Sequence, residues 1–249
     1  MRHYLKACAV FLVLLIATAC TGPTWQLSDY DVSSVRSVGI VSLLGETLEA
    51  NYVGVWAFGN EYWESGKLGW NLNAMSVATV EKYLAGQGFT VIPLSYDRAS
   101  MWKEYLEGQG SYGFRLTEFS STFGLIEPEL VRLSQSTDLD AFLVLTPGHE
   151  GRHCPGGEPC IGYGDRGYGV HNRLGIHHNA YISVMVSLVS AKDLKIMANV
   201  PANQHWPLSF KRWAASLDGY SEQERAEIRA AFEELAASGL REAVGHLGI

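Results

Sequence analysis

Short apolar runs rich in β-branched and aromatic residues recur along the chain and predict strands. Residues 35–45 contain a β-branched run that ends at a glycine, which is the pattern of a buried first strand. Residues 51–59, NYVGVWAFG, alternate in polarity and are rich in valine and aromatic side chains, so they predict a second strand. The runs at 89–94 and 140–148 predict two further strands, the second of them closed by Pro-Gly.

Between these runs, apolar residues recur with helical spacing. Asn71 is a suitable N-cap for a helix that ends at Gly86 or Gly88. The apolar residues of this helix are Ala74, Val77, Val80 and Leu84. Pro128 fits the first position of another helix, where its missing N–H is not needed, and residues 97–106 are a weaker candidate for a third.

The last third of the chain predicts a long hairpin followed by a helix. Residues 179–190 alternate in polarity, AKDLK turns the chain, and a final strand is expected near 195–200. Ser221 and Glu224 form a capping box that starts the C-terminal helix, and Gly239 is a weak point within it. Its apolar stripe consists of Ile228, Phe232, Leu235, Val244 and Leu247. The succession predicts an α/β (α+β) fold, a single mixed sheet backed by helices with a long β-hairpin and a C-terminal helix.

The order of these segments resembles a group of bacterial envelope lipoproteins. This group includes the curli-secretion, penicillin-binding-protein-activator and TolB N-terminal-like α/β modules, in which a strand opens the domain and a strand later ends in a hairpin. The segments SVGIVSLLGE, VWAFGNE and YDRA are similar to uncharacterised proteobacterial envelope lipoproteins. The resemblance covers roughly residues 35–200. It implies a non-enzymatic envelope role and carries over no catalytic residue.

The N-terminus has the layout of a secretory signal. Arg2 and Lys6 precede an eleven-residue apolar run, 7–17, that is too short to cross a bilayer, and small residues then lead to Cys20. A cysteine at this position resembles the lipobox of bacterial lipoproteins, although Ala17 stands where such boxes usually carry leucine. The sequence therefore predicts a signal peptide over 1–19, a lipidated tether over 20–33 and a single domain over 34–249. An ordinary signal peptide or an uncleaved anchor is the alternative.

Charge and the residue after the cysteine indicate where the mature protein acts. Thr21 follows Cys20 in place of aspartate, which in such lipoproteins implies the outer membrane and a domain that faces the periplasm. Removing residues 1–19, which carry Arg2 and Lys6, changes the formal net charge from -7 to -9. An acidic chain without a basic cluster is not expected to bind nucleic acid. The expected partners are the membrane, through lipid on Cys20, and an envelope protein.

The segment HEGRH, with His149, Glu150 and His153, matches the zinc-metalloprotease signature. That chemistry needs a helix, because helical i, i+4 spacing turns both imidazoles toward one zinc ion. Pro-Gly precedes the motif, Gly151 lies inside it and CPGG follows, a composition that helix interiors exclude. The sequence therefore predicts a loop here, and no catalytic residue is assigned.

Histidines nevertheless gather in this part of the chain and form a candidate metal site for Zn²⁺ or Cu²⁺. The candidate ligands are His149, His153, His171, His177 and His178, with His205 further along. The alternative is that they are histidines of exposed loops and strand ends. The main expectation is a protein with no cofactor, and a zinc site is the alternative.

The remaining motifs have structural interpretations. Cys154 and Cys160, in CPGGEPC, predict a small-loop disulfide in an oxidising compartment. Residues 162–167, GYGDRG, match a nucleotide-binding glycine pattern but lead toward a strand, so a hairpin loop is the better interpretation. Glu61 and Glu64 resemble a catalytic carboxylate pair and are expected to be solvated loop charges.

Together these features predict a non-enzymatic outer-membrane lipoprotein that acts by protein–protein contact in envelope assembly or maintenance. The alternative is a periplasmic metal-binding protein or a zinc-dependent hydrolase that uses the HEGRH segment.

Overall fold

The computed structural model describes residues 31–45, 48–53, 61–65, 69–111, 126–148, 167–173, 177–214 and 216–249. Within these residues the strands form one eight-stranded mixed sheet. The strands are β1 (Ser37–Ser42), β2 (Leu48–Val53), β3 (Glu61–Ser65), β4 (Thr90–Ile92), β5 (Ala141–Pro147), β6 (Gly167–Arg173), β7 (His177–Ser190) and β8 (Ile196–Pro207). The helices are α2 (Leu72–Gly86), α3 (Arg98–Ser111), α5 (Glu127–Ser136), α6 (Glu222–Leu235) and α7 (Arg241–Gly245), with a π-helical segment η5 (Ala236–Leu240) and short 3₁₀ turns η2 (Val32–Ser34) and η4 (Leu217–Gly219).

The long strand β7 joins two arms of the sheet. Residues 177–183 of β7 pair antiparallel with β6, and residues 184–190 pair antiparallel with β5. Strand β8 pairs with β7 over residues 179–189 and therefore occupies one edge along both halves. Because a strand has only two edges, β6 and β5 must follow one another along the opposite edge. The sheet therefore forks on that edge of β7, between residues 183 and 184.

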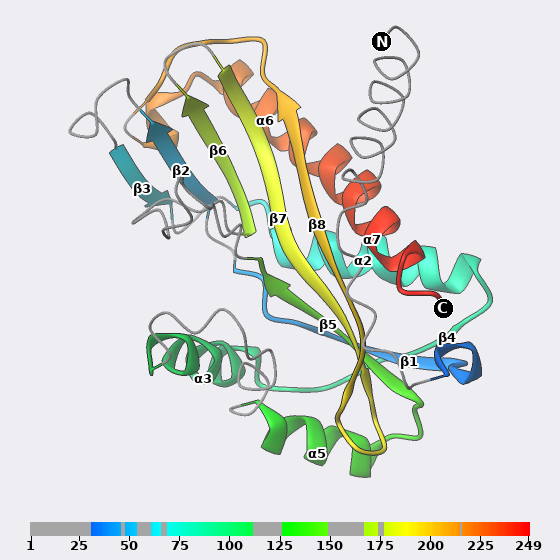
Figure 1. The fold of residues 1–249 in the computed structure, drawn as a ribbon. Helices are drawn as coiled ribbons and strands as arrows, with labels where there is room; N and C mark the ends of the chain where they lie inside the picture. Colours follow the sequence, from blue (N-terminus) through cyan, green and yellow to red (C-terminus); the bar gives the residue numbers. More distant parts are fainter. Residues whose placement is uncertain are drawn as a thin grey trace, which may run out of the picture.

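Each arm continues outward from β7. One arm runs β6–β2–β3, in which β2 is parallel to β6 and antiparallel to β3. The other runs β5–β1–β4, in which all pairings are parallel. Figure 1 shows the two arms diverging from the β7–β8 hairpin, which twists along its length.

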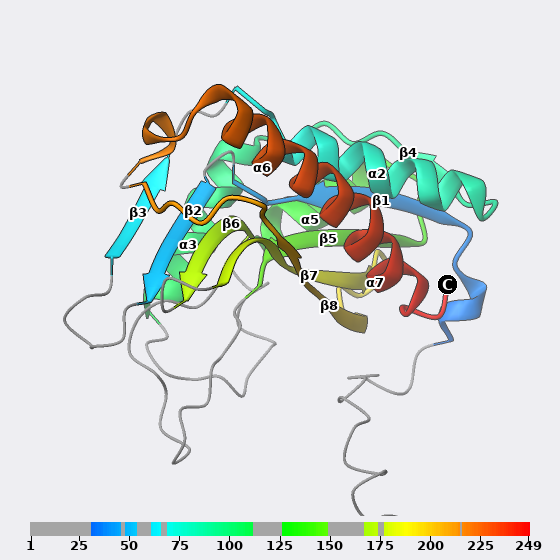
Figure 2. The same cartoon turned by 90° about the horizontal axis from the view of Figure 1, so that it is seen from above.

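Helices cover the sheet on both faces because its strands alternate apolar side chains between the two. In β1, Val38 and Ile40 belong to one buried cluster and Val41 belongs to the other. Helices α2, α6 and α7 pack on the first face, where Figure 2 shows them side by side. Helices α3 and α5 pack on the second face, over the β5–β1–β4 arm.

The predicted helix ends are present. Asn71 caps α2 by accepting a hydrogen bond from the backbone N–H of Ala74 at 3.0 Å. Ser221 and Glu224 form the capping box of α6, and the predicted apolar stripe is buried from α6 through α7 to Leu247. Pro128 is the second residue of α5 and not the first, since that helix begins at Glu127. The fold class and the order of the predicted elements are confirmed.

The buried face of α2 differs from the predicted one. Leu72 and Ser76 are buried together with the predicted Val80 and Leu84, while Ala74 is exposed. The Ser76 hydroxyl lies 2.6 Å from the hydroxyl of Tyr168 on β6 and also donates to the Leu72 carbonyl. A polar residue is stable inside this interface because its hydrogen bonds are satisfied there.

Three strand assignments also change. Strands β3 and β6 were not expected, so Glu61 and Glu64 lie in a strand and not in a loop. Strand β8 continues from the predicted end near residue 200 to Pro207, paired with β7 throughout. The weak point expected at Gly239 coincides with the π-helical segment η5. No helix among the described residues is long and apolar enough to cross a membrane.

Leu143, at the centre of β5, is fully buried between the two paired strands. We expect Leu143→Ala to lower the free energy of unfolding by about 2–5 kcal/mol, because it leaves a cavity in the main core. Val131→Ala on α5 is the matched control; its side chain is 36% exposed, and the change should stay within about 0.5 kcal/mol. Denaturant unfolding of both variants measures the difference, and equal losses would contradict the assigned core.

Candidate binding face of the sheet

A cluster of polar and aromatic side chains lies on the sheet face opposite α2, α6 and α7. The pairing register brings together Asn51 on β2, His171 on β6, Asn179 and Tyr181 on β7, and His205 on β8. Directly paired residues, and residues two positions apart on one strand, share a face of a sheet. These five residues, here called the His171 cluster, therefore project from the same side.

Ring contacts connect the cluster. The ring of His171 stacks on Tyr181 with centroids 5.6 Å apart and an angle of 21° between the planes. The His171 and His205 ring centroids are 5.0 Å apart, and those of Tyr181 and His205 are 6.3 Å apart. Asn179 Nδ2 lies 3.1 Å from His171 Nε2, and Asn51 Nδ2 donates to the Tyr181 hydroxyl at 3.3 Å. Each ring of the cluster thus contacts a side chain from another strand.

Gly169 on β6 makes room for this arrangement. A Cβ atom at this position would lie 2.2 Å from the Tyr181 ring and hydroxyl, and 2.5 Å from the Glu49 carbonyl oxygen. Only glycine allows the tyrosine to lie flat across the neighbouring strand and reach His171. Gly169 makes β6 harder to predict from the sequence, but the His171 cluster requires a glycine at this position.

The cluster is buried at its base and open at its rim. Asn51, His171 and Tyr181 are at most 3% exposed, whereas His205 is exposed. Among the described residues, Asn51 Oδ1 is buried without a hydrogen-bond partner. An unsatisfied buried amide oxygen costs stability, so this position is suited to accept a donor that the described residues do not supply.

His178 lies on the other face of the sheet. It pairs with Asn172, one position from the pair formed by His171 and Asn179, so the two histidines project in opposite directions. Its Nδ1 lies 3.2 Å from the Phe210 carbonyl oxygen, and its ring contacts Phe210 and Tyr220. Burial lowers the pKa of His178, opposed mainly by the hydrogen bond to Phe210. This histidine is a packed core residue.

The other predicted site residues are only partly visible. Cys20, His149, Glu150, His153, Cys154 and Cys160 lie outside the described residues. The lipidation, the disulfide and the HEGRH interpretations therefore stay predictions. His177 begins β7, but its side chain is also outside the described part. Among the described side chains, no group of three or more His, Cys, Asp or Glu residues is arranged to hold a metal ion.

The carboxyl ends of β1, β4 and β5 meet at one edge, where parallel sheets usually bind ligands. Here Tyr96 and Arg98, from the YDRA segment, occupy the end of β1. The backbone N–H of Ser42 donates to the Tyr96 hydroxyl at 2.8 Å, and the Arg98 guanidinium donates to the Leu44 carbonyl. Burial raises the pKa of Tyr96. Both side chains serve to fix the chain that leaves β1.

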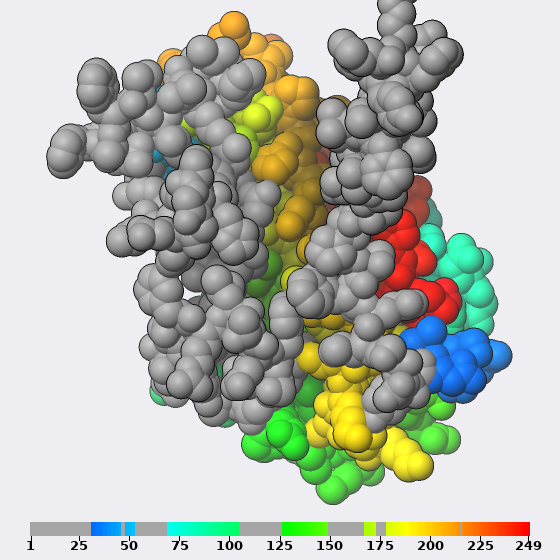
Figure 3. Space-filling view, viewed as in Figure 1, coloured from blue at the N-terminus to red at the C-terminus, as the bar shows by residue number. Residues whose placement is uncertain are grey.

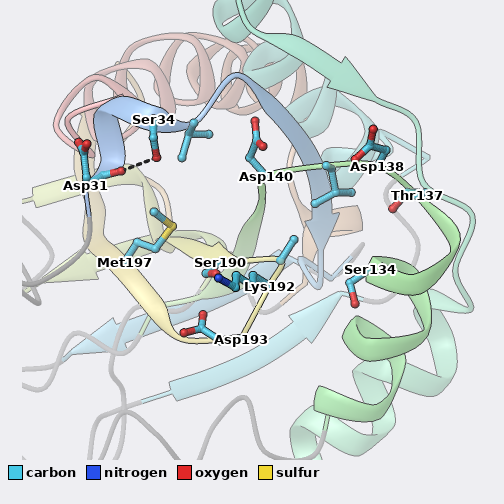
Figure 4. Close-up of a pocket in the computed structure, with 13 residues that line it drawn as sticks. Asp31, Ser34, Ser134, Thr137, Asp138, Asp140, Ser190, Lys192, Asp193 and Met197 are labelled. Carbon is cyan, nitrogen blue, oxygen red and sulfur yellow. Dashed lines mark hydrogen bonds between the residues drawn. The ribbon is translucent and has the colours of Figure 1, made fainter.

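A pocket of about 550 Å³ opens at the opposite edge, where β1 and β5 begin (Figure 4). The Asp140 carboxylate accepts hydrogen bonds from the backbone N–H groups of Arg36 and Ser37, each at 2.8 Å, and from the Ser37 hydroxyl at 3.0 Å. These hydrogen bonds lower the pKa of Asp140. Lys192 and Asp193 enter the pocket from the β7–β8 turn. Asp140 joins the starts of β1 and β5, which is a structural role.

No family model matches the sequence, and no curated protein matches it. Solved structures with a similar backbone include a single-substitution variant of the PelC dodecamer from Paraburkholderia phytofirmans, at 9% identity over 91% of this chain and 98% of that chain, with a TM-score of 0.36. Protein XCC0632 from Xanthomonas campestris, of family model DUF330, shows 10% identity over 85% and 82% of the two chains, with a TM-score of 0.35. Lipoprotein GNA1162 from Neisseria meningitidis shows 13% identity over 81% and 98%, with a TM-score of 0.32. One of these neighbours is a lipoprotein, but likeness of this size assigns no function to the chain.

The lowered pKa of His178 predicts a loss of stability at mildly acidic pH. Its usual pKa near 6.5 applies to the unfolded chain, which therefore takes up a proton first as the pH falls. We expect the free energy of unfolding to decrease from about pH 6.5 downward and the decrease to be smaller in His178→Gln. Denaturant unfolding between pH 7.5 and 5 measures both slopes. Val131→Ala, an exposed change that removes no titratable group, is the control and should keep the wild-type slope; a wild-type slope in His178→Gln would contradict the assignment.

Proposed function

We propose that the chain is a non-enzymatic, outer-membrane lipoprotein that binds an envelope protein through the exposed end of β8. This end, residues 201–207, is here called the β8 tip. Lipid on Cys20 anchors the protein, and residues 34–249 form the periplasmic domain.

The observation that carries this proposal is the composition of the β8 tip. No charged residue occurs from Ile196 to Pro207. Trp206 is 44% exposed on one face of the strand, and Asn203 and His205 are exposed on the other. Figure 3 shows the orange surface of β8 on the face viewed there. Protein interfaces are depleted in charged residues at their centre and enriched in aromatic ones, which is the composition found here.

The prolines of β8 indicate how a partner would bind. The backbone N–H of Leu208, which follows β8, donates to the His178 carbonyl of β7 at 2.9 Å. Because hydrogen-bonded pairs alternate along antiparallel strands, the backbone N–H and C=O groups at even-numbered positions of β8 face β7. Pro201 and Pro207 occupy outward-facing positions, where a missing N–H does not interrupt the pairing with β7. They also withhold the donors that an added strand would need. The β8 tip is therefore suited to contact a folded surface and not to accept a further strand.

The tether sets how far the domain extends from the membrane. Val32–Ser34 form a 3₁₀ turn and Val35 is buried in the core, so the tether runs from Cys20 to Asp31, a distance of eleven positions. A fully extended chain of that length spans at most about 40 Å. The β8 tip would therefore meet partners in the periplasm close to the membrane that holds the lipid.

The anchor is tested by Cys20→Ala. We expect the variant to leave the membrane fraction, because the acyl chains are the proposed attachment. Fractionation of cells by ultracentrifugation and blotting measures this change, with Cys154→Ala as the control that should stay in the membrane fraction. Unchanged fractionation of Cys20→Ala would refute the lipid anchor.

The partner surface is tested by photocrosslinking in intact cells. A photoreactive residue at position 206 is expected to give one discrete adduct, and the same residue at Val131 should not, since that exposed apolar side chain lies on α5. Asn203→Arg should reduce the adduct at 206 at least about tenfold, because it places a charge in a neutral interface. An adduct unaffected by Asn203→Arg, or equal adducts at 206 and 131, would overturn the proposal.

A further inference from the structure

We propose that His171 and His205 together bind one divalent transition-metal ion, Cu²⁺ or Zn²⁺, on the sheet face opposite α2, α6 and α7. The site goes beyond the protein-binding role and does not depend on it. The sequence placed the candidate ligands close together along the chain, whereas the structure pairs two histidines that are 34 positions apart.

The separation of the rings fits shared coordination. A metal–nitrogen bond of 2.0–2.1 Å places an imidazole centroid about 3.2 Å from the ion, so two imidazoles at a tetrahedral angle have centroids about 5.2 Å apart. The centroids of His171 and His205 are 5.0 Å apart, with 50° between the ring planes. The observed separation thus matches that of two imidazoles bound to one ion.

His171 is held in position for this role. Tyr181 supports the face of its ring, and Asn51 holds the Tyr181 hydroxyl in turn. The Asn179 amide nitrogen is a donor, so His171 Nε2 accepts this hydrogen bond with the lone pair that would bind a metal ion. Binding at Nε2 replaces that hydrogen bond, and rotation of the amide turns Asn179 Oδ1 toward the ion. Groups that orient a ligating histidine in this way raise metal affinity.

His205 is the second ligand, and its exposure gives the metal ion access to the site from solvent. It is exposed on the edge strand, whereas His171 is buried beneath it, so an ion enters from the solvent side and keeps water as further ligands. Two imidazoles with oxygen ligands suit Cu²⁺ and Zn²⁺, and Cu²⁺ binds more tightly to such a set. His178 cannot contribute, because it projects from the other face of the sheet.

The test uses full-length protein in detergent micelles titrated with Cu²⁺ alone, followed by calorimetry and electron paramagnetic resonance. We expect one ion per chain and a spectrum with two coordinated nitrogens. His205→Gln, at an exposed position, should fold normally, weaken binding at least about tenfold and leave one nitrogen in the spectrum. His171→Gln should also weaken binding at least about tenfold and leave one coordinated nitrogen in the spectrum.

Two controls separate this site from others. His178→Gln should bind like the wild type, and so should a variant with His149→Gln and His153→Gln. Binding that survives His205→Gln, or that disappears in the His149 and His153 variant, would overturn the proposal, as would the absence of binding. Crosslinking at position 206 reports on the protein partner independently of these results.

Discussion

The backbone hydrogen bonding of β7 is the constraint on which the rest of the structure depends. One edge of this strand carries β6 and then β5, while β8 follows the other edge along both halves. At the fork, the backbone N–H of Gly148 donates to the Ser183 carbonyl at 2.8 Å, and a Cβ atom on Gly148 would lie 2.8 Å from the Ser183 hydroxyl. The close approach of the two chains at this point lets two arms diverge from a single strand.

The fork also divides the face opposite α2, α6 and α7. Beyond it, on the β5–β1–β4 arm, apolar residues such as Phe142 and Val144 are covered by α3 and α5. Before it, the same face carries the polar side chains of the His171 cluster. Strand β7 thus links the core under α3 and α5 to the His171 cluster. Strand β8 brings His205 to that cluster, while Trp206 projects from the opposite face of the sheet. The proposed metal site and the proposed partner surface both follow from this arrangement.

Most of the fold could be predicted from the sequence because local residue patterns determine most of its helices and strands. The capping box at Ser221, the cap at Asn71 and the buried run of β5 each have a local cause, and each is present. Strand β6 has no such signal. Its residues GYGVHNR include two glycines, and its extended state depends on pairing with β7 and with β2, which lies more than 100 positions earlier in the sequence.

The candidate site was predictable only in part for a related reason. The sequence placed His171 and His178 in one candidate metal site because they are close along the chain, but the alternation of paired strands sends them to opposite faces. His205 was the most distant candidate and proves to be the neighbour of His171. The pairing register of β6, β7 and β8 would have indicated that His171 and His205 are close in space. In that register Gly169 pairs with Tyr181, and Tyr181 pairs with His205.

Native-state hydrogen exchange tests most directly whether β7 unites the two arms. Val184 lies next to the fork and is fully buried, so Val184→Ala weakens β7 at the point that both arms share. The slowest amides of β5 and β6 are predicted to exchange with the same free energy of opening in the wild type, and Val184→Ala should lower both by the same amount. Loss of protection in one arm while the other keeps its wild-type value would contradict the account.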